Sequence, residues 1–143
     1  MITLRLVTFE GDDERAIRHI RESVFVEEQG ISAEIDFDGL DASAFQVLVY
    51  MDGEAVGTGR MLGDGHIGRI AVLKPYRGQQ VGTEIVLSFI KVARDKGYER
   101  VYLGAQAQAK GFYENLGFKQ FGESFIDAGD IPHVSMEMVF GQT

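Results

Sequence analysis

The sequence contains no cysteine, which excludes disulfide bonds and catalysis by a thiol nucleophile. It has only two prolines, and no apolar run approaches the roughly 20 residues that a membrane-spanning helix needs. The first residues, Met1 to Leu6, have the pattern of a strand and lack the basic and apolar regions of a secretion signal. We therefore expect a cytoplasmic protein without membrane association.

Basic residues are also scarce: 14 Lys and Arg stand against 22 Asp and Glu, which gives a net charge of −8. Nucleic-acid-binding surfaces are usually basic, so we expect no nucleic-acid partner. The length of 143 residues suits one domain with a sizeable core, and no linker, repeat or low-complexity segment marks a boundary. We predict a single domain over residues 1–143 and no metal cofactor.

The apolar pattern predicts the order of the elements. Strands are expected over residues 2–7, 45–50, 55–61, 67–72, 100–103, 119–121 and 134–139. Helices are expected after a cap at Asp12 or Asp13, from Val81 to Lys96 with Gly97 as a left-handed end, and over residues 110–116. Asp52-Gly53 is typical of a tight hairpin, and the acidic, glycine-broken stretch 27–41 predicts no element. Hairpins followed by a strand–helix–strand unit imply a mixed α/β sheet.

One glycine pattern has the spacing of a nucleotide-binding motif but lacks the neighbouring elements that such a motif needs. The segment Gly63-Asp64-Gly65-His66-Ile67-Gly68 has the GxGxxG spacing of a dinucleotide-binding motif. That motif works only between a strand and the start of a helix. The residues that follow it are strand-like and run to Pro75, so we interpret the segment as a hairpin turn.

The segment from Val72 to Thr83, in contrast, joins a predicted strand to a predicted helix. A helix start offers unpaired N–H groups and the positive end of the dipole, both of which attract phosphate. Gly78 and Gly82 let a ligand approach the main chain, and Arg77 adds positive charge. The lysine and serine or threonine of a P-loop are absent, which argues against nucleoside triphosphate hydrolysis. By itself this turn is either a pyrophosphate site or an ordinary connection.

A second segment, Gln106 to Phe118, carries a family resemblance. Its pattern Ala109-x-x-Phe112-Tyr113-x-x-Leu116-Gly117-Phe118 is similar to a motif of the GNAT superfamily of acetyl-CoA-dependent N-acetyltransferases. The Arg77 to Gly82 turn is similar to the (Gln/Arg)-x-x-Gly-x-(Gly/Ala) pyrophosphate motif of that superfamily, in the expected order. The pieces 24–30 and 131–133 further resemble a bacterial subgroup of GNAT proteins.

The resemblance implies a GNAT-like fold, a central mixed sheet with a splayed parallel strand pair flanked by helices. It also implies transfer of the acetyl group of acetyl-CoA to a primary amine by direct attack. The implied coenzyme A contacts are Ile70, Ala71, Val72, Arg77, Gly78, Gln79, Gln80, Val81, Gly82, Thr83, Gln106 and Phe112. Tyr113 would protonate the leaving thiolate, since a phenol has a pKa of about 10. Because aromatics at helical spacing also build cores, we expect Phe112 and Leu116 in the core and the Tyr113 hydroxyl at the site.

This sequence departs from the family pattern at three places. Gln80 stands where the motif usually has glycine, so its side chain would crowd the phosphates unless it points outward. Gln106 stands where asparagine is common. Gly68 and Arg69 occupy the strand position where many relatives carry a carboxylate base. The missing carboxylate keeps a second hypothesis open, a non-catalytic acyl-CoA-binding or sensor domain.

Acidic residues gather between Glu22 and Asp41, with no lysine or arginine among them. In the resembling fold this region flanks the acceptor site, where a negative pocket would attract a cationic amine; the alternative is a solvated acidic surface. We predict Glu28 as base or amine anchor, with Glu27 beside it, and His133 as a further acceptor-site candidate. The expected partner is a small-molecule or peptide amine, and aminoglycosides, polyamines, amino sugars and protein amines all fit. Small GNAT proteins are often dimers, so a homodimer is also an option.

Overall fold

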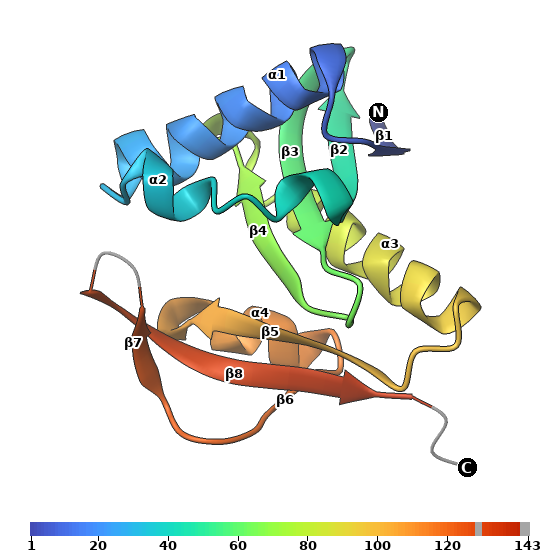
Figure 1. Cartoon of the computed structure of the whole chain (residues 1–143), viewed down its shortest axis with the longest axis vertical. Coiled ribbons are helices and arrows are strands. Elements are labelled where there is room, and N and C mark those ends of the chain that lie inside the picture. Colours follow the sequence, from blue (N-terminus) through green and yellow to red (C-terminus); the bar gives the residue numbers. More distant parts are fainter. Residues whose placement is uncertain (128–129, 141–143) are drawn as a thin grey trace.

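Two sheets form the centre of the fold and diverge from one another (Figure 1). The computed structural model describes residues 1–127 and 130–140. The first sheet has the order β1 (Ile2–Val7), β2 (Phe45–Met51), β3 (Glu54–Met61), β4 (Ile67–Val72), with antiparallel neighbours throughout. In the second sheet, β8 (Ile131–Val139) pairs antiparallel with three strands: β5 (Arg100–Gln106), β6 (Lys119–Gln120) and β7 (Phe125–Asp127).

Helices cover both faces of the first sheet. On one face lies α1 (Gly11–Arg21), which continues as the π-helix η1 (Glu22–Glu28) and is followed by the short α2 (Ala33–Asp36). On the other lies α3 (Val81–Asp95), while α4 (Lys110–Asn115) packs on β5. Because side chains alternate along a strand, Leu48 of β2 packs with α1 and its neighbours Val47 and Val49 pack with α3.

The close approach of α3 to the sheet depends on glycine. A Cβ atom on Gly57 of β3 would lie 2.6 Å from Val81 Cγ1, and one on Gly59 would lie 2.7 Å from Ile85 Cγ2. The helix ends before Gly97, whose φ of +77° is the left-handed conformation that the sequence predicts. The predicted strand–turn–helix unit around this element is confirmed.

The two sheets meet at the beginning of their facing strands. A parallel bridge joins His66 to Tyr102, and the Tyr102 amide donates to the Gly65 carbonyl at 3.0 Å. Beyond this bridge β4 and β5 separate, and a pocket lies between them. The structure therefore confirms the expected splayed parallel pair. The predicted hairpin turn is also present, but it ends at His66, because Ile67 and Gly68 already belong to β4.

Several local predictions need correction. The stretch 27–41 is not without structure, since it contains the end of η1 and the whole of α2. The residue before α1 is Glu10, and neither Asp12 nor Asp13 caps the helix. Strand β8 begins three residues earlier than predicted and pairs with β7, which the pattern did not indicate. Within the described residues, no helix is long and apolar enough to cross a membrane.

Candidate active site

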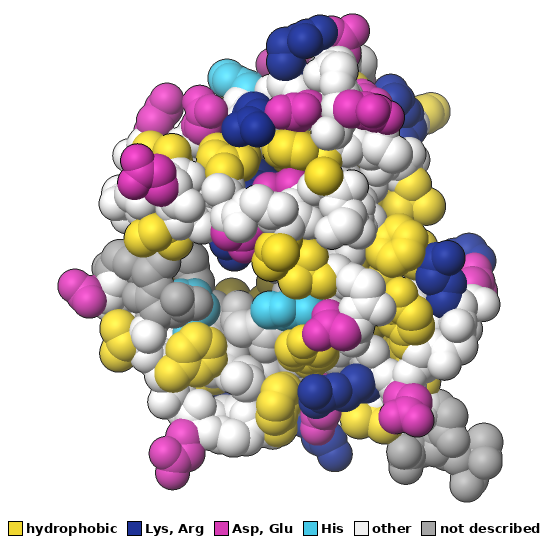
Figure 2. All heavy atoms as spheres, in the orientation of Figure 1, with side chains coloured by type: hydrophobic (Ala, Val, Ile, Leu, Met, Phe, Trp, Pro, Cys, Tyr) yellow, Lys and Arg dark blue, Asp and Glu magenta, His cyan; other side chains and the backbone are white. Residues whose placement is uncertain are grey.

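A pocket of about 880 Å³ opens where β4 and β5 diverge, and Figure 2 shows the hollow with histidine side chains at its edge. Its walls come from η1, α2, β4, β5, α4 and the strands around β8. Many of the predicted site residues line it: Ile70, Ala71, Val72, Arg77, Gln106, Phe112, Tyr113 and His133. The structure thus brings together residues from both halves of the chain.

The predicted phosphate turn adjoins one end of this pocket. A Cβ on Gly82, in the first turn of α3, would lie 3.5 Å from the ring of the pocket-lining Phe112. The Glu84 amide donates to the Gln80 carbonyl at 3.0 Å, so the amides of residues 81–83 precede the helical hydrogen-bond ladder. These amides lie where a helix start binds an anion.

The structure explains why glycine suits the position of Gln80. Gln80 is the residue before α3 and has φ 70° and ψ 13°, the left-handed conformation that glycine adopts without strain. Its side chain is exposed and is not among the pocket-lining residues. Glutamine in place of the motif glycine therefore strains the backbone at this position, whereas its side chain leaves the space for a ligand open.

Arg77 and Glu28 form a bidentate ion pair at the same end. The Arg77 Nη atoms donate to the two Glu28 carboxylate oxygens at 2.6 and 2.7 Å, and Arg77 Nε donates to the Val72 carbonyl at 2.9 Å. The hydrogen bond from Arg77 lowers the pKa of Glu28, which makes this carboxylate a weaker base. Neither Glu28 nor the exposed Glu27 is among the pocket-lining residues. This geometry argues against the prediction that Glu28 is the base and Glu27 its neighbour at the acceptor.

Three aspartates of the acidic stretch are held by arginines instead of facing a substrate. The buried Arg21 contacts Asp36 at 3.1 Å and Asp41 at 2.6 Å. Arg60 of β3 contacts Asp38 at 2.7 Å and Asp41 at 3.1 Å. We call these residues, together with Arg69, the ion-pair cluster.

Arg69 completes this cluster from β4. It lies at a bulge with φ 51°, and its guanidinium contacts Asp36 and Asp38, each at 3.2 Å. Burial raises the pKa of Asp36, and the charges of Arg21 and Arg69 oppose that shift. Three positive and three negative side chains balance, so the expected negative pocket is wrong for Asp36, Asp38 and Asp41.

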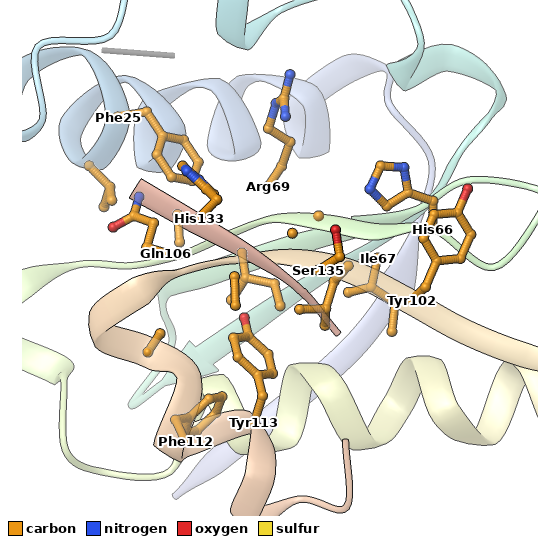
Figure 3. Close-up of a pocket in the computed structure, with 18 of the residues that line it drawn as sticks. Phe25, His66, Ile67, Arg69, Tyr102, Gln106, Phe112, Tyr113, His133 and Ser135 are labelled. Atoms are coloured by element: carbon orange, nitrogen blue, oxygen red, sulfur yellow. The ribbon is translucent and has the colours of Figure 1, made fainter. Parts of the chain in front are cut away.

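Tyr113 of α4 points its hydroxyl into the pocket (Figure 3). Its side chain is 9% exposed, and burial raises its pKa to about 12. The ring packs edge-on against Phe112 and Phe118, with centroids 4.9 and 5.8 Å away. Leu116 packs on the core as expected, but Phe112 is 37% exposed and lines the pocket, so its predicted place in the core is wrong.

His133 and Gln106 lie opposite one another on β8 and β5. His133 Nδ1 is 2.7 Å from the Ile131 carbonyl, which can only accept, so Nδ1 carries a hydrogen. The His133 ring stacks on Phe125 at 5.5 Å with an interplanar angle of 24°. Gln106 Nε2 donates to Gln29 Oε1 at 2.9 Å, which ties β5 to the end of η1.

Sequence reasoning missed a second aromatic pair at the other end of the pocket. His66 stacks on Tyr102 at 4.6 Å with an interplanar angle of 12°, and the Tyr102 hydroxyl donates to Asp64. Burial lowers the pKa of His66, which Asp64 partly opposes. No sequence pattern marks this pair, because its rings come from a hairpin turn and a distant strand.

Comparison with known proteins identifies the family. A family model described as an acetyltransferase (GNAT) domain matches residues 13–140. The chain belongs to the GNAT acetyltransferases. The chain is 40% identical over 122 residues to the uncharacterized N-acetyltransferase YjcF of Bacillus subtilis, covering 82% of this chain and 86% of YjcF.

Solved structures agree with this GNAT assignment. The crystal structure of Escherichia coli ElaA aligns with a TM-score of 0.84 and 29% identity, over 96% of this chain and 99% of ElaA. A GNAT family acetyltransferase from Elizabethkingia anophelis with acetyl-CoA bound aligns with a TM-score of 0.72 over 97% of this chain and 98% of that protein. At 19% identity the second alignment shows the fold alone. The expected GNAT fold is confirmed.

Proposed function

We propose that this GNAT protein transfers the acetyl group of acetyl-CoA to a primary amine by direct attack. The observation that carries the proposal is the Tyr113 hydroxyl, which points into a pocket that adjoins the start of α3 at one end. The acetyl-CoA bound to the Elizabethkingia neighbour supports the choice of donor.

The donor would lie along the gap between β4 and β5. The amides from Gly78 to Thr83, with Gln79, Gln80 and Val81 between them, would hold the pyrophosphate. The free backbone edge of β4 from Ile70 to Val72 would pair with the pantetheine arm, and its amides would polarise the thioester carbonyl. Arg77, Gln106 and Phe112 also line the pocket and would contact the arm.

The chemistry follows from the acidity of Tyr113. The neutral amine attacks the thioester carbon, so a C–N bond forms, the C–S bond breaks, and the nitrogen loses one proton. Since a thiol has a pKa of about 8.5, complete transfer from a phenol with a pKa of about 12 is uphill. Tyr113 therefore donates a hydrogen bond that stabilises the departing sulfur, and the proton from the amine restores the thiol.

We assign the acceptance of that proton to His133. The hydrogen bond from Nδ1 to the Ile131 carbonyl selects the Nδ1–H tautomer of a neutral ring, and the stack on Phe125 orients the ring plane. Nε2 is then the atom able to accept a proton from an amine in the pocket. This assignment replaces Glu28, whose carboxylate is bound by Arg77.

A Tyr113→Phe variant tests the proposal. We expect coenzyme A affinity to stay within about twofold, while kcat for amine-dependent thiol release falls about 10²–10³-fold, as for the loss of one hydrogen-bond donor to developing negative charge. Tyr98→Phe is the matched control, because Tyr98 packs on the core outside the pocket and should keep full activity. Unchanged kcat in Tyr113→Phe would remove Tyr113 from the mechanism. Coenzyme A binding by wild type without thiol release from any amine would favour the sensor hypothesis.

A further inference from the structure

The aspartate and the arginines that line the pocket are all held in ion pairs. Among the described lining residues Asp36 is the carboxylate, and it is already bound by Arg21 and Arg69. The other lining arginines are paired as well, Arg77 with Glu28 and Arg100 with Glu137, each at 2.6–2.7 Å. A ligand with several ammonium groups would find no free carboxylate here.

Aromatic rings line the pocket on several sides. Phe25 enters from η1, and the Phe125–His133 stack enters from β7 and β8. In Figure 3, Phe25 and His133 lie on one side of the pocket and the Tyr113 hydroxyl approaches from the other. The His66–Tyr102 stack closes the end where β4 meets β5.

The rim of this region is apolar as well. Ile35 of α2 is 50% exposed and Phe125 is 37% exposed, and both line the pocket. A ligand that covers half-exposed apolar side chains around a concave site removes them from water, and this burial favours its binding. Their position predicts an acceptor with an apolar body next to its amine.

We propose that the acceptor is a monoamine with an aromatic ring, an arylalkylamine, which deepens and rests on the proposed acetyl transfer. The ring would extend the Phe125–His133 stack, and aromatic neighbours at such spacings attract one another beyond simple burial. The amine would lie between His133 Nε2 and the thioester. A balanced, apolar pocket disfavours the ammonium form of a bound amine, so it also favours the neutral nucleophile.

A polycationic acceptor is disfavoured by the same contacts. Each further ammonium group taken from water needs a carboxylate partner, and without one its desolvation is uncompensated. Polyamines and aminoglycosides, which an acidic pocket would suit, therefore do not match this lining.

Calorimetric titration of amines into the protein with excess coenzyme A tests the acceptor class without relying on turnover. The probes are 2-phenylethylamine, butylamine as the aliphatic monoamine, spermidine and kanamycin. We expect 2-phenylethylamine to bind at least about tenfold more tightly than the other three, because ring burial and stacking add to the amine contacts. Equal or tighter binding of butylamine, spermidine or kanamycin overturns the proposal.

Two variants test whether Phe125 causes the selectivity for 2-phenylethylamine. Phe125→Ala should weaken 2-phenylethylamine binding about three- to tenfold and leave butylamine and coenzyme A affinity unchanged. Leu87→Ala is the control, since Leu87 is 45% exposed on α3 outside the pocket and should change none of the three affinities. An unchanged affinity for 2-phenylethylamine in Phe125→Ala contradicts the proposed stack. Selective arylalkylamine binding without acetyl transfer would refute the proposed function alone, whereas acetylation of spermidine in preference would refute the acceptor class alone.

Discussion

Replacement of Arg21 by methionine tests whether the aspartates beside the pocket are neutralised. Arg21 is fully buried, and it donates to the Asp36 carboxylate at 3.1 Å, the Asp36 carbonyl at 2.6 Å and the Asp41 carboxylate at 2.6 Å. Methionine has a long unbranched side chain but no charge. In Arg21→Met, three aspartates of the ion-pair cluster would face two arginines.

The expected cost comes from the charge that stays behind. Removal of one partner from a buried ion pair costs about 3–5 kcal/mol, because the other charge remains buried without compensation. Asp36 keeps Arg69 and Asp41 keeps Arg60, so we expect the lower end of that range. For a chain of this size a loss of about 3 kcal/mol lowers Tm by about 6–12 °C.

Thermal and urea unfolding followed by circular dichroism measure this loss. Arg15→Met is the matched control, since Arg15 pairs with Asp12 on the surface of α1, and such pairs contribute about 0–1 kcal/mol. Adding Asp41→Asn to Arg21→Met should recover part of the lost stability, because it removes the uncompensated charge. If Arg21→Met loses no more stability than Arg15→Met, the balanced cluster is refuted, and the argument against a polycationic acceptor fails with it.

Three further predictions concern stability. Gly59→Ala should cost about 1–3 kcal/mol in urea unfolding, because its Cβ would lie 2.7 Å from Ile85 Cγ2, whereas Gly63→Ala has open space and should be neutral; equal effects would contradict the tight packing of α3. Gln80→Gly should raise stability by about 0.5–1 kcal/mol through relief of the left-handed backbone, and a loss would contradict that geometry. The hydrogen bond from Arg60 lowers the pKa of Asp38, so its stabilisation is present above about pH 4 and is lost below it. In Asp38→Asn the free energy of unfolding should fall less steeply as the pH is lowered into the acid range. An unchanged slope would show that protonation of Asp38 does not cause the acid loss of stability.

The strand–turn–helix unit to which we assign coenzyme A was predictable because it is local in sequence. The unit from Ile67 through the turn to α3 contains its own strand pattern, glycines and helix start, and the structure has this unit as predicted. Tyr113 followed from a second short motif. For Phe112 the motif implied a coenzyme A contact and the helical spacing implied a core position, because spacing alone does not distinguish a core face from a pocket face.

The part of the pocket to which we assign the acceptor was not predictable because it is assembled from distant segments. The π-helix η1 has no recognisable sequence pattern, and it places Phe25 opposite strands near the other end of the chain. The acidic stretch has no basic residue within it, yet its aspartates pair with Arg21 just before it and with Arg60 and Arg69 in later strands. Charge counted along the sequence therefore predicted a negative pocket where the fold has a balanced one.

The most direct test of the central claim follows both products of one reaction, from acetyl-CoA and 2-phenylethylamine. Thiol release is measured by a chromogenic reagent, and the acetylated amine is measured by mass spectrometry. We predict that thiol release requires the amine and that the two products form in equal amounts. Thiol release without the amine, or tight acetyl-CoA binding with no acetylated product from any amine, would contradict acetyl transfer as the function of this chain.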